Sequence, residues 1–369
     1  MPTTTGGSPK KAPAKNKTAA LKKATPTSDI FAGLKAAINK KVGGAHCEVM
    51  SESNIAVCKE EECVKMPTYD LSRLMCGELK RGLPAKSLTL LVGVEHSFKS
   101  SLSILMARNA LKNGYKPIII DTEGGITNDF SKRWGLNTED AFYVYSPWVE
   151  EVKGVLAQIK ETGEEKYCII IDSVGGLDKL KSYDDALKGD PKADMGTLAR
   201  AIKSTLKLLV NIIKSQNSIG IITSHFYSQS GLIPMPDSVV GGKSVLLLPD
   251  IILYLKKGGK KDTNRAGSDK LINVLTIKNR FSPIDRQGVV EIDYENGINE
   301  MAGMIDLAIE LEVVEQKGAH FYIDGASFHG IAAFNAALNE NVKIRESMIE
   351  SINTVLMGKG YSNFKGDIE

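Results

Sequence analysis

The sequence contains no apolar run close to the roughly 18 residues that a membrane-spanning helix requires. Its first residues are polar and basic and lack the apolar core of a secretory signal, so we expect no export signal. Cysteine is scarce and odd in number, with five residues, which argues against a disulfide framework and favours a reducing compartment. The composition therefore predicts a protein without membrane association.

The cysteines also lack the paired C-x₂-C spacing that is typical of zinc-binding motifs. Cys47, Cys58, Cys63 and Cys76 lie in one region, where zinc binding is the minor alternative. Cys168 lies within an apolar run, so we expect it in the core.

Acidic residues are absent from residues 1–28, which hold six of the 47 Lys and Arg residues. This leaves 41 basic residues against 44 Asp and Glu in the rest of the chain. The rest is therefore slightly acidic, and nucleic-acid binding would depend on local basic patches. We expect residues 1–28 to form a disordered basic tail that either contacts nucleic acid loosely or only aids solubility.

The 369 residues are 42% hydrophobic and 25% charged, as in ordinary globular proteins. After the tail, residues 29–65 are expected to form an N-terminal arm with a helix over Ile30 to Lys41 and a strand near Cys47–Cys58. Such an arm cannot bury its own apolar face, so it would dock on the core or on a neighbouring subunit. Residues 66–302 would form the core, and residues 303–369 a small second unit.

Continuous apolar strands alternate with helices from Leu88 onwards, which predicts the α/β class with a mostly parallel central sheet. The predicted strands cover residues 88–92, 117–121, 141–145, 167–172, 218–225, 251–255, 271–278 and 289–293, with helices over 149–161 and 195–215. From Gly303 we expect a helix, a hairpin over Ala319–Phe328 and helices to about Gly358. Ligands bind at the carboxyl ends of the strands in such sheets.

The segment GVEHSFKS, residues 93–100, separates the first apolar strand from helical spacing and has the form of a P-loop. A P-loop wraps phosphates with backbone N–H groups at a helix N-terminus. Lys99 would reach the β- and γ-phosphates, and the Ser100 hydroxyl would bind Mg²⁺. Phe98 replaces the usual second glycine, so a simple turn before a surface helix is the alternative. The predicted nucleotide-binding residues here are Gly93, Val94, Glu95, His96, Ser97, Phe98, Lys99, Ser100 and Ser101.

Polar side chains end three further strands. Asp172 would hold Mg²⁺ beside the P-loop, although a strand-terminal Asp can also cap a turn. Glu123 would orient or deprotonate the attacking water, with Asp121 in support. His225 would contact the γ-phosphate, and the alternative is a half-buried histidine bonded to a neighbouring strand.

Two segments of about 15 residues, 179–194 and 226–240, lack a clear pattern and are long enough to be functional or disordered. The first leads into a helix that carries Arg200, Lys203 and Lys207. Basic side chains beside such loops suit a polyanionic partner, and a solvated helix face is the alternative.

Eight motifs, within residues 66–358, resemble in their order the RecA-type DNA recombinases. They are GVEHSFKS, IIIDTEGGIT, IIIDS, ADMGTLARAIKSTLK, IITSH, VVGGKSVLLLPDIIL, LTIKNR and GMIDLAIELEVVEQKGAHFYIDG. Phenylalanine at the second P-loop glycine looks most like the phage recombinases of the UvsX type. The resemblance implies a RecA-like P-loop ATPase core, a small N-terminal helix and strand arm for polymerisation, and a small α+β C-terminal domain that gathers DNA.

The resemblance also implies roles for single residues. Lys99 and Ser100 match the P-loop lysine and the Mg²⁺-binding hydroxyl, Glu123 the catalytic carboxylate, and Asp172 the second metal-site acid. Phe130 stands where the family stacks an aromatic residue near adenine.

Two of these positions depart from the common pattern of the family. Thr127 replaces a frequent acid near adenine. His225 replaces a more usual Gln and keeps a polar sensor.

Lys278 and Arg280 resemble the paired cations that reach the ATP of the neighbouring subunit and supply transition-state charge in trans. The segments 179–194 and 226–240 resemble the two DNA-binding loops of the family. The DNA-binding residues implied are Met195, Gly196, Arg200, Lys207, Gly241 and Gly242.

We therefore expect a recombinase that uses ATP and Mg²⁺ to form a helical filament on single-stranded DNA, pairs it with homologous duplex DNA and exchanges strands. The resemblance places it in the cytoplasm of a bacterial cell or phage-infected host, with loading and single-strand-binding proteins as further partners. Two rivals are a hexameric helicase motor with the same core and a non-catalytic filament regulator. The IKNR pair and the C-terminal unit favour the recombinase over the helicase, and intact Lys99, Ser100, Glu123 and Asp172 argue against the regulator.

Overall fold

The computed structural model describes residues 27–41, 62–163, 165–188, 195–225, 239, 241–259, 270–282, 286–293, 295 and 297–359. The chain divides into two compact units, residues 1–57 and 58–369, which we treat separately. In the first unit, α1 (Thr27–Lys41) confirms the predicted helix, and its side chains Phe31 and Leu34 are exposed. The strand expected near Cys47–Cys58 and the tail up to residue 26 lie outside the described residues.

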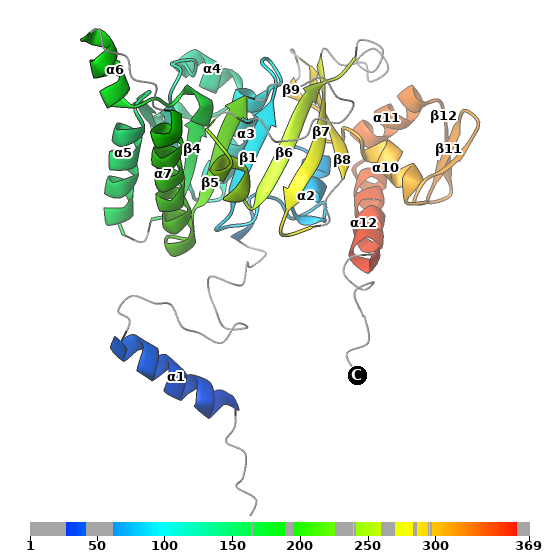
Figure 1. The fold of residues 1–369 in the computed structure, drawn as a ribbon. Coiled ribbons are helices and arrows are strands. Elements are labelled where there is room, and N and C mark those ends of the chain that lie inside the picture. The colour runs from blue at the N-terminus through cyan, green and yellow to red at the C-terminus, as the bar shows by residue number, and fades with distance from the viewer. Residues whose placement is uncertain are drawn as a thin grey trace, which may run out of the picture. The chain divides into compact units, whose positions relative to one another are not determined.

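A sheet of nine strands forms the centre of the second unit (Figure 1). The strands are β1 (Leu88–Gly93), β2 (Lys116–Asp121), β3 (Phe142–Tyr145), β4 (Tyr167–Asp172), β5 (Ile219–His225), β6 (Ile251–Lys257), β7 (Lys270–Asn279), β8 (Gln287–Asp293) and β9 (Gly297–Ile298). Their order is β3-β2-β4-β5-β1-β6-β7-β8-β9. Strands β1 to β6 are parallel, and β7 to β9 extend the sheet antiparallel. The prediction of a mostly parallel sheet is confirmed.

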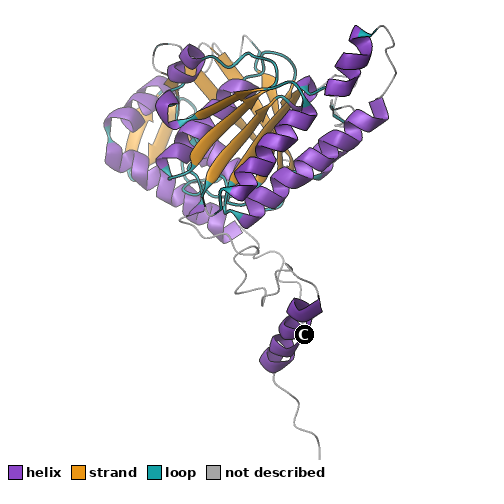
Figure 2. Cartoon of the chain, turned by 90° about the vertical axis from the view of Figure 1, so that its left-hand side faces the viewer, coloured by secondary structure: helices purple, strands orange, loops and turns teal. Residues whose placement is uncertain are grey.

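Helices cover both faces of the parallel strands (Figure 2). On one face α2 (Tyr69–Cys76) and α3 (Lys99–Lys112) pack over side chains such as Ile170, and on the other α5 (Val149–Glu161) and α7 (Met195–Ser215) pack over Ile169 and Ile171. Successive residues of one strand point to opposite faces, so a strand covered on both sides must be apolar throughout. The helices predicted over 149–161 and 195–215 are confirmed.

The sequence suggested that the segment 179–194 is irregular throughout, but part of it is helical. It forms α6 (Leu180–Leu187), and residues 189–194 lie outside the described part. Leu180, Tyr183 and Leu187 follow helical spacing, and the Tyr183 ring lies 5.1 Å from that of Trp148. Charged residues separate these three side chains in the sequence, so their helical spacing was not recognised there.

The C-terminal part has its own apolar core. It contains α10 (Met304–Glu310), β10 (Glu315–Lys317), β11 (His320–Ile323), β12 (Ala326–His329), α11 (Ile331–Glu340) and α12 (Val342–Lys359). Phe321 and Phe328 stack on Phe334 in this core. The predicted hairpin is part of a three-stranded sheet, because the short polar segment Glu315–Lys317 adds a strand that has no apolar pattern. The domain boundaries at 65/66 and 302/303 stay predictions.

Two further features concern membranes and metals. Within the described ranges, no helix is both long and apolar enough to cross a bilayer. The same ranges contain no group of three or more His, Cys, Asp or Glu side chains that could hold a metal ion. Cys47 and Cys58 lie outside them, so the zinc alternative stays untested.

Candidate active site

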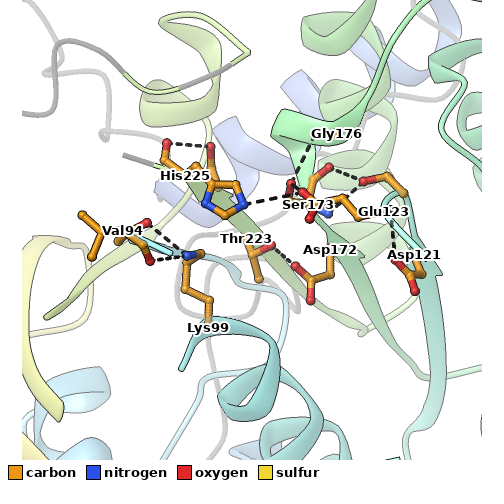
Figure 3. Close-up of polar contacts among 12 residues, drawn as sticks. Val94, Lys99, Asp121, Glu123, Asp172, Ser173, Gly176, Thr223 and His225 are labelled. Atoms are coloured by element: carbon orange, nitrogen blue, oxygen red, sulfur yellow. Dashed lines mark hydrogen bonds and ion pairs between the residues drawn. The ribbon is translucent and has the colours of Figure 1, made fainter. Parts of the chain in front are cut away.

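The carboxyl ends of four parallel strands meet at one edge of the sheet (Figure 3). Gly93 at the end of β1 is in register with His225 at the end of β5, and Asp121 of β2 is in register with Asp172 of β4. A cavity of about 420 Å³ opens at this edge. Its lining residues are Glu95, His96, Ser97, Phe98, Lys99, Ser100, Ser101, Glu123, Phe130, Asp172, His225 and Lys270. Most of the predicted nucleotide-site residues therefore lie together.

Lys99 begins α3 and reaches back across the loop that precedes it. Its Nζ donates hydrogen bonds to the carbonyl oxygens of Gly93 at 3.0 Å and Val94 at 2.8 Å. Burial lowers the pKa of Lys99, while the charges of Asp172, Glu123 and Glu95 act in the opposite direction. The loop therefore holds a desolvated ammonium group at the cavity, which suits an anionic ligand.

Phe98 occupies the conformation for which P-loops normally use glycine. Its φ of +76° lies in the left-handed region, which costs a residue with a side chain about 1–2 kcal/mol. The ring is buried and packs edge-to-face on Trp134 with 5.1 Å between ring centroids. An aromatic contact of this kind contributes about 0.5–1.5 kcal/mol beyond burial. Packing thus offsets the backbone cost, and the loop keeps its shape without the second glycine.

This geometry predicts that Phe98→Gly is more stable than Phe98→Ala, the reverse of the usual order of the two residues. Phe98→Ala should lower the free energy of unfolding by about 3 kcal/mol, because it removes a buried ring. Phe98→Gly should be about 0.5–1 kcal/mol more stable than Phe98→Ala, because glycine adopts positive φ without a clash. Urea unfolding followed by circular dichroism measures both variants. An alanine variant that is more stable than the glycine variant would contradict the left-handed geometry.

Asp172 and Ser100 bring two oxygen donors together. The Asp172 carboxyl is hydrogen-bonded by the hydroxyls of Ser100 and Thr223, and these bonds lower its pKa, although the larger effect of burial raises it. Mg²⁺ prefers one or two protein oxygens together with phosphate and water oxygens. The pair Ser100 and Asp172 fits this ion. Thr223 was not predicted, although a polar residue two positions before His225 in an apolar strand was a visible signal.

Glu123 projects from the end of β2 toward β4 and β5. Its Oε1 accepts a hydrogen bond from Ser173 Oγ at 2.5 Å and lies 3.6 Å from His225 Nε2. The side chain of Glu123 is 49% exposed, so it can meet a ligand in the cavity. The residue expected to sense the γ-phosphate therefore lies beside the residue expected to activate water.

Asp121 shapes the turn that carries Glu123. Its Oδ1 accepts the backbone N–H groups of Glu123 at 3.0 Å and Gly124 at 2.8 Å, and its Oδ2 accepts that of Ile126 at 2.8 Å. The Tyr143 hydroxyl donates a fourth hydrogen bond to this carboxylate, at Oδ2, with a distance of 3.0 Å. Asp121 is buried, so its support of Glu123 is through the backbone.

A second cavity of about 480 Å³ adjoins the first. Phe98, Phe130 and Trp134 contribute to its wall, and Phe98, Ser101, Phe130 and Lys270 line both cavities. Phe130 lies on α4 (Asn128–Arg133), which Thr127 caps by accepting the Phe130 N–H at 3.1 Å. Thr127, which departs from the acid of the family pattern, thus positions the predicted aromatic residue. Trp134 and Lys270 were not predicted from the sequence.

The comparison with known families agrees with this arrangement. Residues 48–299 match the family described as RecA N-terminal domain. The chain belongs to the RecA family. It is 25% identical over 284 residues to Protein RecA of Francisella tularensis subsp. tularensis, covering 76% of this chain and 78% of the relative. It is 24% identical over 274 residues to Protein RecA of Campylobacter jejuni, covering 73% and 79%. The match to UvsX-type proteins stays a prediction.

Two predicted catalytic cations of this RecA-family chain lie away from its own cavity. Lys278 Nζ donates to the carbonyl oxygen of Leu247 at 2.7 Å, and Arg280 Nη1 lies 2.8 Å from Asp250 Oδ1. Lys278 is near the end of β7, Arg280 is the first residue after it, and neither lines the cavity. This position is compatible with a role in a neighbouring subunit.

The predicted DNA-binding residues of the RecA-family chain lie along α7 and at the glycine turn that packs on this helix. Gly241 and Gly242 have positive φ of 98° and 85°, and a Cβ at Gly241 would lie 3.6 Å from Ile202 Cδ1 of α7. Arg200 is exposed, and its Nε donates to the Gly196 carbonyl at 3.2 Å. Lys207 lies about 10 Å further along the helix. Residues 226–238 and the side chain of Met195 lie outside the described part.

Proposed function

We propose that the chain is an ATP-dependent homologous recombinase that forms helical filaments on single-stranded DNA and exchanges strands with homologous duplex DNA. One observation carries the proposal. The P-loop, the acids Glu123 and Asp172, and the polar end of β5 converge on one cavity, at the edge from which both predicted DNA loops leave the sheet. ATP binding and DNA binding would therefore share the same strand ends.

In this proposal each polar group at the cavity has one task. Lys99 binds the β- and γ-phosphates, and Ser100 with Asp172 holds Mg²⁺. The ion, when bound, neutralises phosphate charge during transfer. Glu123 deprotonates or orients the attacking water, and the Ser173 hydroxyl fixes the Glu123 carboxylate by its 2.5 Å hydrogen bond. Phe130 stacks near the base in the second cavity.

His225 would pass the state of the nucleotide to DNA. It lies 3.6 Å from Glu123 and is the last residue before the second predicted DNA loop. Loss of the γ-phosphate would therefore act directly on the first residue of that loop. The turn at Gly241 and Gly242, where the loop returns, packs on the start of α7. Both loops would respond together.

A filament requires a surface that accepts the next subunit. β3 is an edge strand, and its side chains Phe142, Tyr143 and Tyr145 are exposed. An exposed aromatic edge strand is a template for strand addition. We assign it to the strand of the N-terminal arm, residues 29–65, of a neighbouring copy. Residues 303–369 would gather duplex DNA.

Negative-stain electron microscopy tests the proposal. The sample contains the protein, single-stranded DNA, Mg²⁺ and a slowly hydrolysed ATP analogue. We expect continuous helical filaments that are lost when the nucleotide is omitted. Closed rings would favour the helicase motor, and bare DNA would contradict a self-assembling recombinase.

A further inference from the structure

Lys270 is a basic residue at the nucleotide cavities to which no role has yet been given. It begins β7, pairs with Ile292 of β8 and is half-buried. It follows a stretch rich in lysine, so the sequence did not distinguish it from surface lysines. The fold brings it to His96 of the P-loop, 174 residues earlier in the chain.

Lys270 contacts the outer half of the P-loop directly. Its Nζ donates to the His96 carbonyl oxygen at 3.2 Å and lies 5.8 Å from the centroid of the Phe98 ring. His96 and Phe98 both have positive φ. Lys99 binds the start of the loop at Gly93 and Val94, whereas Lys270 binds its middle at His96, so the two ammonium groups hold different parts of the same loop.

The electrostatic surroundings of Lys270 favour an anion. Burial lowers the pKa of its ammonium group, and the nearby charge of Lys257 lowers it further. The carbonyl of His96 accepts one of three N–H donors. A phosphate oxygen in the cavity could accept another and would restore part of the lost solvation.

The position of Lys270 selects one part of the nucleotide. It is one of four residues that line both cavities, together with Phe98, Ser101 and Phe130. Phosphates in the first cavity and a base in the second would place the α-phosphate between them. We propose that Lys270 binds the α-phosphate of the nucleotide held by its own subunit. This rests on the proposed function, because it takes the two cavities as one nucleotide site.

A contact to the α-phosphate serves ATP and ADP alike. It would increase affinity for both nucleotides and leave the hydrolysis step to Glu123. A purely structural role, in which Lys270 only holds the His96 carbonyl, would instead appear as a loss of stability. Arginine keeps the charge and the donors, whereas glutamine keeps only donors.

Binding measurements with mant-ADP and a mant-labelled, slowly hydrolysed ATP analogue test this assignment. We expect Lys270→Gln to raise Kd for both nucleotides by one similar factor of about 10 or more, the usual effect of losing a charged hydrogen bond. Lys270→Arg should stay within about threefold of the unmodified protein, because its charge remains. Steady-state assays of Lys270→Gln should show a raised KM for ATP with nearly unchanged kcat.

Lys257→Gln is the matched control, because Lys257 is exposed at the end of β6 and lines neither cavity. The Kd of Lys257→Gln for both nucleotides should not rise. Unmodified affinity in Lys270→Gln overturns the inference, and so does a loss confined to the ATP analogue, which would place the contact at the γ-phosphate. An equal loss in Lys270→Arg would also overturn it. If the unmodified protein binds neither nucleotide, the proposed function itself fails.

Discussion

Replacing Lys99 by alanine is expected to reduce DNA-dependent ATP turnover by at least about 100-fold. The substitution removes the ammonium group that the P-loop presents to the phosphates, and with it both ground-state binding and stabilisation of charge in the transition state. Turnover is measured as phosphate release with saturating single-stranded DNA. Persistent ATPase activity in Lys99→Ala would refute the assignment of the site.

Lys112→Ala is a suitable control, because Lys112 is exposed in the last turn of the same helix α3. It should keep full turnover. Lys99→Ala should also remain folded. Burial disfavours the charged form of Lys99, so the substitution removes a group that is costly to bury. Equal unfolding midpoints for both variants would show that loss of activity is not loss of structure.

Arg280→Ala should lower turnover by about 1,000-fold or more, as loss of an arginine finger does. Its guanidinium lies by Asp250 in its own chain and outside the cavity. The Arg280 side chain is 58% exposed, so its ion pair with Asp250 adds at most about 1 kcal/mol to stability. A large effect on turnover would therefore come from another subunit's site.

Mixing two inactive variants separates the two subunits. A Lys99→Ala subunit has an intact Arg280, and an Arg280→Ala subunit has an intact Lys99. In an equal mixture, about a quarter of head-to-tail interfaces would combine both intact residues. We expect turnover near that fraction of the unmodified protein. If the mixture is no more active than its components, Arg280 does not act across the interface.

Short-range patterns in the sequence predicted the parallel strands and the main helices well. The bounds of α5 and α7 follow from apolar residues at helical spacing, and the strand ends at Asp172 and His225 follow from polar residues after apolar runs. These features depend on neighbours in sequence. They also placed Lys99, Glu123 and Asp172 at a common edge, because parallel strands align their carboxyl ends.

Contacts between residues far apart in the chain could not be predicted from the sequence. In the sequence, nothing distinguishes Lys270 from other lysines or Trp134 from other aromatic residues. Their contacts with His96 and Phe98 appear only in the fold. Only the fold shows that Phe98 adopts a positive φ, as glycine does in this position. A pattern of residue types specifies a motif, but not which distant side chain completes it.

β7 has Lys270 at its first residue and Lys278 next to its last, and Arg280 follows directly after the strand. An extended strand spans about 27 Å between positions 270 and 278. If both assignments hold, this one strand touches its own nucleotide at one end and the neighbour's at the other. Hydrogen bonding to β6 and β8 stiffens it, so a displacement at one end is transmitted to the other. Successive ATP sites would then behave as a one-dimensional chain with nearest-neighbour coupling, in which hydrolysis spreads along the filament as a front.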